Sequence, residues 1–248
     1  MKWLYRIYQL VIALPLGLLA TVVAAVVTIV GCTLGGARFW GYYPGRMWAR
    51  FIIRILLLPV HVEGRENLLK HQSYIFVANH QGAFDIFLIY GFLNRNFKWM
   101  MKQSLRKLPF VGAACAAARH IFIDRSSKDS IVRSHDAARN RLKNGMSLVV
   151  FPEGSRTHDG HLQPFKRGAF LLADELQLPV VPLTIEGAYQ VMPRQRDGKW
   201  ATWHPLKLTI HQPVEHLGEK GNENVRHLLQ QSRNIIVEHL GDNTETTT

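Results

Sequence analysis

Cysteine is scarce in this chain of 248 residues: Cys32 and Cys115 are the only two. Two cysteines exclude a disulfide framework, and their apolar surroundings lead us to expect both to be reduced and buried. There is no glycine-rich dinucleotide fingerprint, no P-loop and no zinc spacing such as H-E-x-x-H. These absences remove the common nucleotide-binding and zinc-protease classes from consideration.

Acidic residues are few. Asp and Glu number 18 against 30 Lys and Arg, so the formal net charge is +12. Such a chain is expected to meet an anionic partner, either nucleic acid, anionic lipid or a phosphorylated substrate. With 47% hydrophobic and 19% charged residues, the chain is not disordered.

Charge is missing altogether from Ile7 to Ala37, and Leu10–Cys32 consists mainly of Leu, Val, Ile and Ala. A helix of this length spans a hydrocarbon core of about 30 Å. The run is longer than the apolar region of a signal peptide and lacks a clear small-x-small cleavage site, which favours a retained anchor. Pro15 and Gly17 interrupt it, so both a membrane span and a re-entrant hairpin remain open.

A second apolar stretch, Met47–Val60, carries Arg50 and Arg54 on one helical face and suits the membrane interface. No acid precedes Glu63, whereas six basic residues do: Lys2, Arg6, Arg38, Arg46, Arg50 and Arg54. Four of the six follow the first apolar run. The positive-inside rule therefore predicts that the rest of the chain lies on the cytoplasmic side of the inner membrane, against an anionic leaflet.

We expect three parts: a membrane-anchoring segment over residues 1–58, an α/β domain over 59–240 and a flexible tail over 241–248. Short apolar runs predict strands, and helical patterns alternate with them. The fold class is therefore α/β, with a mixed, largely parallel sheet flanked by helices. The predicted strands are Ser73–Ala78, Phe97–Met101, His120–Asp124, Ser147–Phe151, Val180–Ile185 and Leu206–His211, and the predicted helices are Asp85–Gly91, Val111–Arg119, Lys128–Lys143, Phe165–Leu176 and Asn222–Leu240.

His80 and Asp85 follow the first of these strands, five residues apart. Ligands in such sheets bind at the carboxyl ends of strands. A tight turn at Gly82 can bring the Asp85 carboxylate back to Nδ1 of His80, which leaves Nε2 as a base. The alternative is an ordinary helix cap beside a structural histidine.

Further polar residues follow the other strands. Glu153, Gly154 and Arg156 lie in the segment Phe151-Pro152-Glu153-Gly154-Ser155-Arg156, where glycine allows close backbone approach and arginine can bind phosphate. Lys102 and Arg125 each end another strand. Each of these residues alone could be an ordinary surface residue. If the strand ends lie close together, however, the residues would form one basic cleft.

Four blocks stand in order: His80 to Asp85, Phe122-Ile123-Asp124-Arg125, Phe151 to Arg156 and Val181-Pro182-Leu183. They resemble the ordered blocks of the glycerolipid acyltransferase superfamily, above all its 1-acyl-sn-glycerol-3-phosphate acyltransferase (lysophosphatidate acyltransferase) branch. The resemblance covers roughly residues 59–211. Ser155 stands where a threonine is common, which retains the hydroxyl.

The resemblance implies an O-acyltransferase of phospholipid biosynthesis. It would move a fatty acyl group from acyl-CoA or acyl carrier protein to the 2-hydroxyl of lysophosphatidate, giving phosphatidate. His80 and Asp85 would be catalytic, with no metal and no cofactor beyond the thioester co-substrate. Lys102, Arg125 and Arg156 would hold the acceptor phosphate, and Glu153 and Gly154 would shape its pocket.

Three other functions stay open. A metal-dependent phosphoester hydrolase would use His80, Asp85 and Asp124, but a dense carboxylate cluster is missing. A membrane-tethered nucleic-acid-binding module would suit the charge of +12, but the basic residues are spread along the chain and no such motif occurs, so no nucleic-acid partner is expected. The third is acylation of another lyso-lipid, such as a lyso-ornithine lipid or a lysophospholipid with a headgroup.

Overall fold

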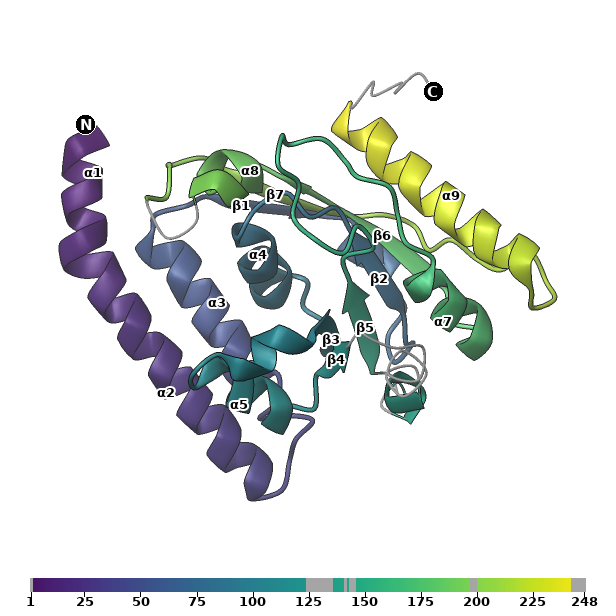
Figure 1. The fold of residues 1–248 in the computed structure, drawn as a ribbon, viewed down its shortest axis with the longest axis horizontal. Coiled ribbons are helices and arrows are strands. Elements are labelled where there is room, and N and C mark those ends of the chain that lie inside the picture. Colours follow the sequence, from purple (N-terminus) through teal and green to yellow (C-terminus); the bar gives the residue numbers. More distant parts are fainter. Residues whose placement is uncertain (1, 124–135, 141, 143–145, 197–199, 242–248) are drawn as a thin grey trace.

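A twisted sheet forms the centre of the protein (Figure 1). The computed structural model describes residues 2–123, 136–140, 142, 146–196 and 200–241. Within these residues, seven strands lie in the order β1-β7-β6-β2-β5-β3-β4. Only β6 and β7 pair antiparallel, which confirms the predicted mixed, largely parallel sheet. The strands are β1 (Val60–Glu63), β2 (Ile75–Ala78), β3 (Phe97–Lys102), β4 (Ile121–Ile123), β5 (Ser147–Val150), β6 (Val180–Glu186) and β7 (Leu206–Ile210).

The central strand β2 shows why both faces of the sheet are covered. Its four residues are all buried, and because side chains alternate along a strand they enter two cores. Phe76 and Ala78 join the core beneath α3 and α4, whereas Ile75 and Val77 join the core beneath α7 and α9. The helices are α3 (Tyr43–Ile55), α4 (Phe84–Phe92), α5 (Val111–Ala117), α7 (Gly168–Leu176), α8 (Ala188–Val191) and α9 (Asn222–Leu240).

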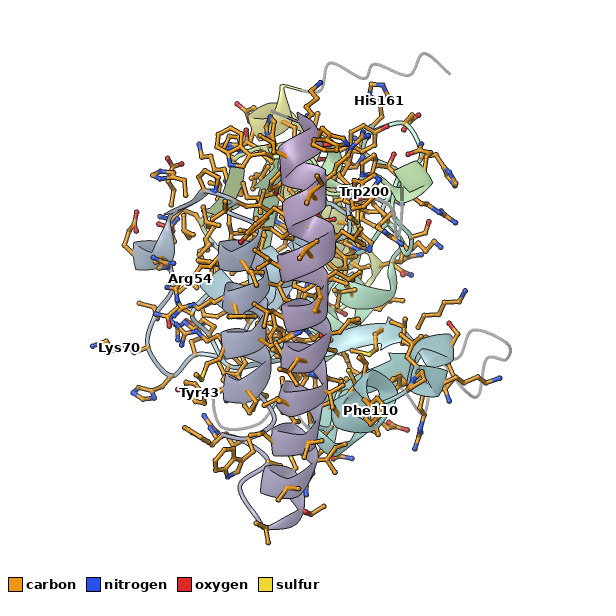
Figure 2. All side chains as sticks on the ribbon, turned by 90° about the vertical axis from the view of Figure 1, so that its left-hand side faces the viewer. Tyr43, Arg54, Lys70, Phe110, His161 and Trp200 are labelled. Atoms are coloured by element: carbon orange, nitrogen blue, oxygen red, sulfur yellow. The ribbon has the colours of Figure 1, made fainter. Side chains whose placement is uncertain are left out.

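The N-terminal segment is one helix from Lys2 to Thr33, made of α1 (Lys2–Tyr8), a π-helical turn η1 (Gln9–Ala13) and α2 (Leu14–Thr33). Among the described residues it is the one helix long and apolar enough to cross a membrane. Its outer face exposes many Leu, Val and Ile side chains (Figure 2). The chain then turns back, so that α3 runs beside α2 (Figure 1).

Several boundaries differ from the expected ones. The helix predicted over Met47–Val60 ends at Ile55, and Val60 begins the edge strand β1, which the sequence reading missed. Pro59 explains the change, because proline disfavours helical backbone in the residue before it. The helix predicted from Phe165 begins at Gly168.

Other expectations are met only in part. Residues 136–140 of the helix predicted over Lys128–Lys143 are helical, and most of its remaining positions lie outside the described residues, as does nearly all of the predicted tail. Both cysteines are free thiols, as expected, but each is only partly buried.

Candidate active site

The turn after β2 brings His80 and Asp85 together. Nδ1 of His80 lies 2.8 Å from Oδ2 of Asp85, which is the hydrogen bond predicted from the spacing. The same oxygen accepts the backbone N–H groups of Gln81 (2.7 Å) and Gly82 (2.9 Å). A carboxylate that accepts from Nδ1–H fixes the tautomer, so Nε2 of His80 carries the lone pair.

Glycine at position 82 is required by close packing. A Cβ there would collide with the carbonyl of Ala188. Gly82 also forms an isolated bridge with Pro193, and the N–H of Ala83 donates to the carbonyl of Met192 at 3.3 Å. The segment from α8 to Pro193 therefore braces the turn that carries His80.

Aromatic stacking holds the imidazole of His80 in its plane. The ring lies against Phe151 with centroids 3.8 Å apart and an interplanar angle of 10°, and Phe151 in turn stacks on Trp99. The His80 side chain is 13% exposed. The ring is thus fixed on one face and at Nδ1, while its remaining edge borders the cavity described below.

Glu153 holds the backbone on either side of the site. Its Oε1 accepts the N–H of His80 at 2.6 Å, and its Oε2 accepts the N–H of Gln163 at 2.9 Å. Burial raises the pKa of Glu153 to about 7, the charge of Asp85 adds to the rise, and the two N–H donors oppose it. Both oxygens of Glu153 accept backbone N–H groups. Glu153 therefore positions His80 and also Gln163, which lies in the loop between β5 and α7.

The other predicted site residues differ in how close they lie to the cavity. Lys102, at the exposed end of β3, and Gly154 border the same cavity as His80. Arg156 lies next to Thr157, whose N–H donates to the carbonyl of His80 at 2.9 Å, so the chain passes the site again there. Arg125 lies outside the described residues, and so does Asp124.

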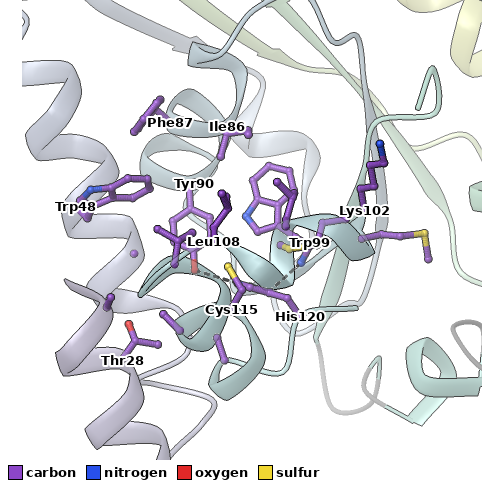
Figure 3. A pocket seen from close by; sticks show the side chains of 18 of the residues that line it. Thr28, Trp48, Ile86, Phe87, Tyr90, Trp99, Lys102, Leu108, Cys115 and His120 are labelled. Atoms are coloured by element: carbon purple, nitrogen blue, oxygen red, sulfur yellow. Dashed lines mark hydrogen bonds between the residues drawn. The ribbon is translucent and has the colours of Figure 1, made fainter. Parts of the chain in front are cut away.

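An apolar cavity of about 390 Å³ is lined by His80 and by side chains of the N-terminal helix. Figure 3 shows the cavity from close by. Its walls come from α2, α3, α4, α5 and the ends of β3 and β5. Trp48 and Thr28 lie on one side of it and Lys102 on the other (Figure 3). A long apolar chain can therefore lie in the cavity with its reacting end beside Nε2 of His80.

The helix α2 faces this cavity with small side chains at helical spacing: Thr21, Ala24, Ala25 and Thr28. From the sequence, the apolar run is predicted only as an anchor, and this stripe of small residues is not predicted. The spacing of small residues within a run of Leu and Val was the available signal. Asn79 is not predicted either; its side chain exchanges two hydrogen bonds of 2.8 Å with the backbone of Ile185 and ties β2 to β6.

No group of three or more His, Cys, Asp or Glu side chains that could hold a metal ion occurs in the part of the chain that the structure describes. The described site consists of the imidazole of His80, the buried carboxylate of Asp85 and the apolar cavity. An imidazole that is hydrogen-bonded to a buried carboxylate beside an apolar cavity is able to act as a general base toward an apolar ligand.

Comparison with known proteins gives the family. A family model described as acyltransferase matches residues 59–186, about half of the chain. The chain belongs to this acyltransferase family. Its structure is similar to the crystal structure of the 1-acyl-sn-glycerophosphate (LPA) acyltransferase PlsC from Thermotoga maritima, with a TM-score of 0.74, 28% sequence identity and coverage of 99% of this chain and 100% of that one.

Several curated relatives carry the same name, 1-acyl-sn-glycerol-3-phosphate acyltransferase. The 1-acyl-sn-glycerol-3-phosphate acyltransferase alpha of Mus musculus is 31% identical over 77% of this chain and 72% of its own length. The chloroplastic 1-acyl-sn-glycerol-3-phosphate acyltransferase of Brassica napus is 29% identical over 80% of this chain and 58% of its own length. This chain spans 58%, 63% and 55% of the lengths of three such relatives, from Brassica napus, Cocos nucifera and Arabidopsis thaliana.

Proposed function

We propose that this protein transfers a fatty acyl group from an acyl thioester to the 2-hydroxyl of 1-acyl-sn-glycerol 3-phosphate, which gives phosphatidate. One observation carries the proposal: an imidazole oriented by a buried carboxylate stands at the end of an apolar cavity bounded by the N-terminal helix. The names of the relatives and of the similar crystal structure agree with this reaction.

The chemistry needs one proton transfer in each direction. Nε2 of His80 takes the proton of the 2-hydroxyl as its oxygen attacks the thioester carbonyl carbon. Asp85 stabilises the imidazolium that forms. The tetrahedral intermediate then releases the thiolate, which receives the proton back from His80 and leaves as the free thiol. No covalent bond to the protein forms.

The acceptor phosphate is assigned to the basic residues around the cleft. Lys102 borders the cavity, and a lysine ammonium at its rim suits a phosphate. We assign the same role to Arg156 and Arg125, the latter on its position in the motif alone. Gly154 has a φ of 81°, a conformation that glycine adopts without strain, and it lets substrate approach the backbone.

The acyl chain and the membrane give the N-terminal helices their role. We assign residues 1–58 to membrane anchoring, 59–240 to the acyltransferase domain and 241–248 to a tail. The exposed apolar face of α1 and α2 would enter the bilayer. We assign the catalytic part to the cytoplasmic side of the inner membrane, against its anionic lipids. The excess of Lys and Arg after this helix supports this assignment.

The direct test uses the purified full chain in detergent, labelled acyl-CoA and a panel of lyso-lipids. We expect label in phosphatidate, loss of that label in His80→Ala and no effect of a chelator. His61→Ala is the matched control, because His61 is exposed and contacts Glu63 on the edge strand β1. Label mainly in another lyso-lipid product would overturn the acceptor, and full activity in His80→Ala would overturn the mechanism.

If acyl-CoA gives no product, the same assay is run with acyl carrier protein as donor. Product with the carrier protein alone would identify the donor. Absence of product with both donors would contradict the proposed function.

A further inference from the structure

Two segments next to the cavity expose apolar side chains. One is the outer face of α2, and the other is the segment between β3 and α5. The segment between β3 and α5 consists of the 3₁₀ helix η3 (Gln103–Lys107) and a turn through Phe110. Within it, Leu105, Leu108 and Phe110 are 39%, 46% and 55% exposed. Large exposed apolar side chains gathered within one short segment indicate a binding surface.

This segment and α2 both line the same cavity. Leu105, Leu108 and Val111 line the cavity from one side, and the small side chains of α2 line it from another. Phe110 does not line the cavity. In the view of Figure 2 it lies on the opposite side of α2 from Tyr43 of α3. The exposed apolar side chains of α2 and of this segment therefore belong to two elements that both line the cavity.

The backbone at Phe110 adopts a strained conformation. Its φ is 57°, in the left-handed region, which is uncommon for residues other than glycine. Phe110 immediately precedes α5, and its exposed ring gains nothing from the core. An exposed aromatic held in a strained turn suits contact with something outside the protein.

The charge around this segment indicates which partner. Lys102, Arg106 and Lys107 are all exposed, and no acidic residue occurs between Asp85 and Asp124. Apolar side chains surrounded by lysine and arginine match a bilayer surface with anionic headgroups. The guanidinium of Arg106 lies 5.7 Å from the ring centre of Phe122, so part of this basic collar is held in place.

We propose that residues 103–111 are a second lipid-contacting surface, which rests on the same anionic leaflet as α2. Lipid then meets the protein on both sides of the cavity, and a fatty acyl chain enters sideways from the leaflet, between α2 and this segment. The route for the chain rests on the proposed function, whereas the lipid contact does not.

Depth-dependent quenching tests the contact without any activity measurement. A fluorescent label is placed on Phe110→Cys or Leu105→Cys in a Cys32→Ser, Cys115→Ala background. The protein is then bound to phosphatidylglycerol-containing vesicles whose acyl chains carry bromine. Leu217→Cys is the matched control, since Leu217 is 57% exposed but lies in the loop before α9.

We expect both labels on the segment to be quenched several-fold more than the label at Leu217. Equal quenching at all three positions would overturn the proposal. Labels at two positions in the segment keep the test valid if one variant fails to fold.

Activity tests the entry route. In Phe110→Glu, we expect the rate with lyso-lipid and long-chain donor in anionic vesicles to fall about tenfold, because a carboxylate is repelled from the anionic leaflet. The rate with short-chain, water-soluble donor and acceptor should stay within about twofold of the unchanged protein, since the reacting groups are untouched. A similar loss with both substrate sets would overturn lateral entry, and inactivity of the unchanged protein would instead count against the proposed function.

Discussion

The side-chain amide of Gln9 and the backbone of Ala201 exchange two hydrogen bonds across 192 residues of sequence. Nε2 of Gln9 donates to the carbonyl at 2.8 Å, and Oε1 accepts the N–H at 2.9 Å. Gln9 begins the π-helical turn, and both residues are buried. Thr202 in turn donates to the carbonyl of Val191 at 2.9 Å, next to the residues that brace Gly82. The N-terminal helix is thus linked, through Ala201 and Thr202, to the segment that supports the His80 turn.

Replacing Gln9 tests this link. Gln9→Met keeps the length of the side chain but orphans the N–H and the carbonyl of Ala201, at about 1–3 kcal/mol for each group. We expect a lower midpoint of thermal unfolding in detergent and a reduced kcat with an unchanged KM. Gln9→Glu, which still accepts the N–H, should lie between the two. Unchanged kcat and stability in Gln9→Met would contradict the link.

The carboxylate of Asp85 uses its two oxygens unequally. Oδ2 accepts three hydrogen bonds, whereas Oδ1 has no partner within the described part of the chain. An asparagine oxygen in the position of Oδ2 can keep all three contacts, so Asp85→Asn removes the charge and little else. We expect kcat to fall between about 10²- and 10⁴-fold, with a thermal midpoint near that of the unchanged protein. Asp85→Ala should lose both activity and stability.

Glu153 predicts a pH-dependent stability. Its pKa is about 7 in the folded protein against 4.5 for the ordinary carboxyl. Between these values the folded protein keeps a proton that the unfolded chain releases, so the free energy of unfolding falls as pH rises from 4.5 to 7. The fall is about 3 kcal/mol at most. Denaturant titrations across this range should show a smaller slope against pH in Glu153→Gln.

Activity gives a second readout for Glu153. Since glutamine cannot accept both backbone N–H groups, His80 should shift, and we expect about a 100-fold loss of kcat. If Glu153 instead contacted the acceptor, Glu153→Gln would mainly raise the KM for lyso-lipid.

The stripe of small residues on α2 predicts an effect on chain length. Ala25 is buried and borders the cavity, so Ala25→Phe should fill part of its 390 Å³. We expect a loss of activity with long acyl donors and retention with short ones, measured over a series of acyl-CoA lengths. Val23→Phe is a control, because Val23 is exposed on the outer face of the helix. Equal losses at every length would contradict this role.

His211 predicts acid sensitivity on the other side of β6. Burial and the nearby His239 lower the pKa of His211 from 6.5 to about 4. The unfolded chain binds a proton below about 6.5 that the folded protein refuses, so stability falls as pH drops from 6.5 to 4. His211→Asn should reduce this fall, whereas His61→Asn, at an exposed position, should not. Thermal unfolding across this pH range provides the measurement.

Much of this architecture follows from local pattern. Short apolar runs bounded by turns predict strands over Ser147–Phe151 and Val180–Ile185, and the structure has strands over Ser147–Val150 and Val180–Glu186. The pairing of His80 with Asp85 is predictable as one of two alternatives, because five residues with a glycine between them permit a tight turn. The strand β1 is not, because its half-exposed residues continue an apolar run without a break other than Pro59.

The contacts that complete the site come from the packing of distant segments. The stacking of Phe151 on His80 depends on β5 lying beside β2. The inward orientation of Glu153 depends on Gln163 returning to it, and the cavity depends on α2 packing against α5. No local sequence pattern determines these contacts. The motif therefore indicates which residues form the site, but not which neighbours each of them contacts.

The cavity wall formed by α2 changes how the protein can be dissected. Cutting the chain before β1 is the usual way to obtain a water-soluble fragment of an anchored protein. Here such a cut would strip away Thr21, Ala24, Ala25 and Thr28 together with Trp48, and would leave an open trough of apolar residues facing water. The helix proposed as the anchor is also a wall of the cavity, so a fragment cut away from that helix is expected to lose its ability to hold an acyl chain.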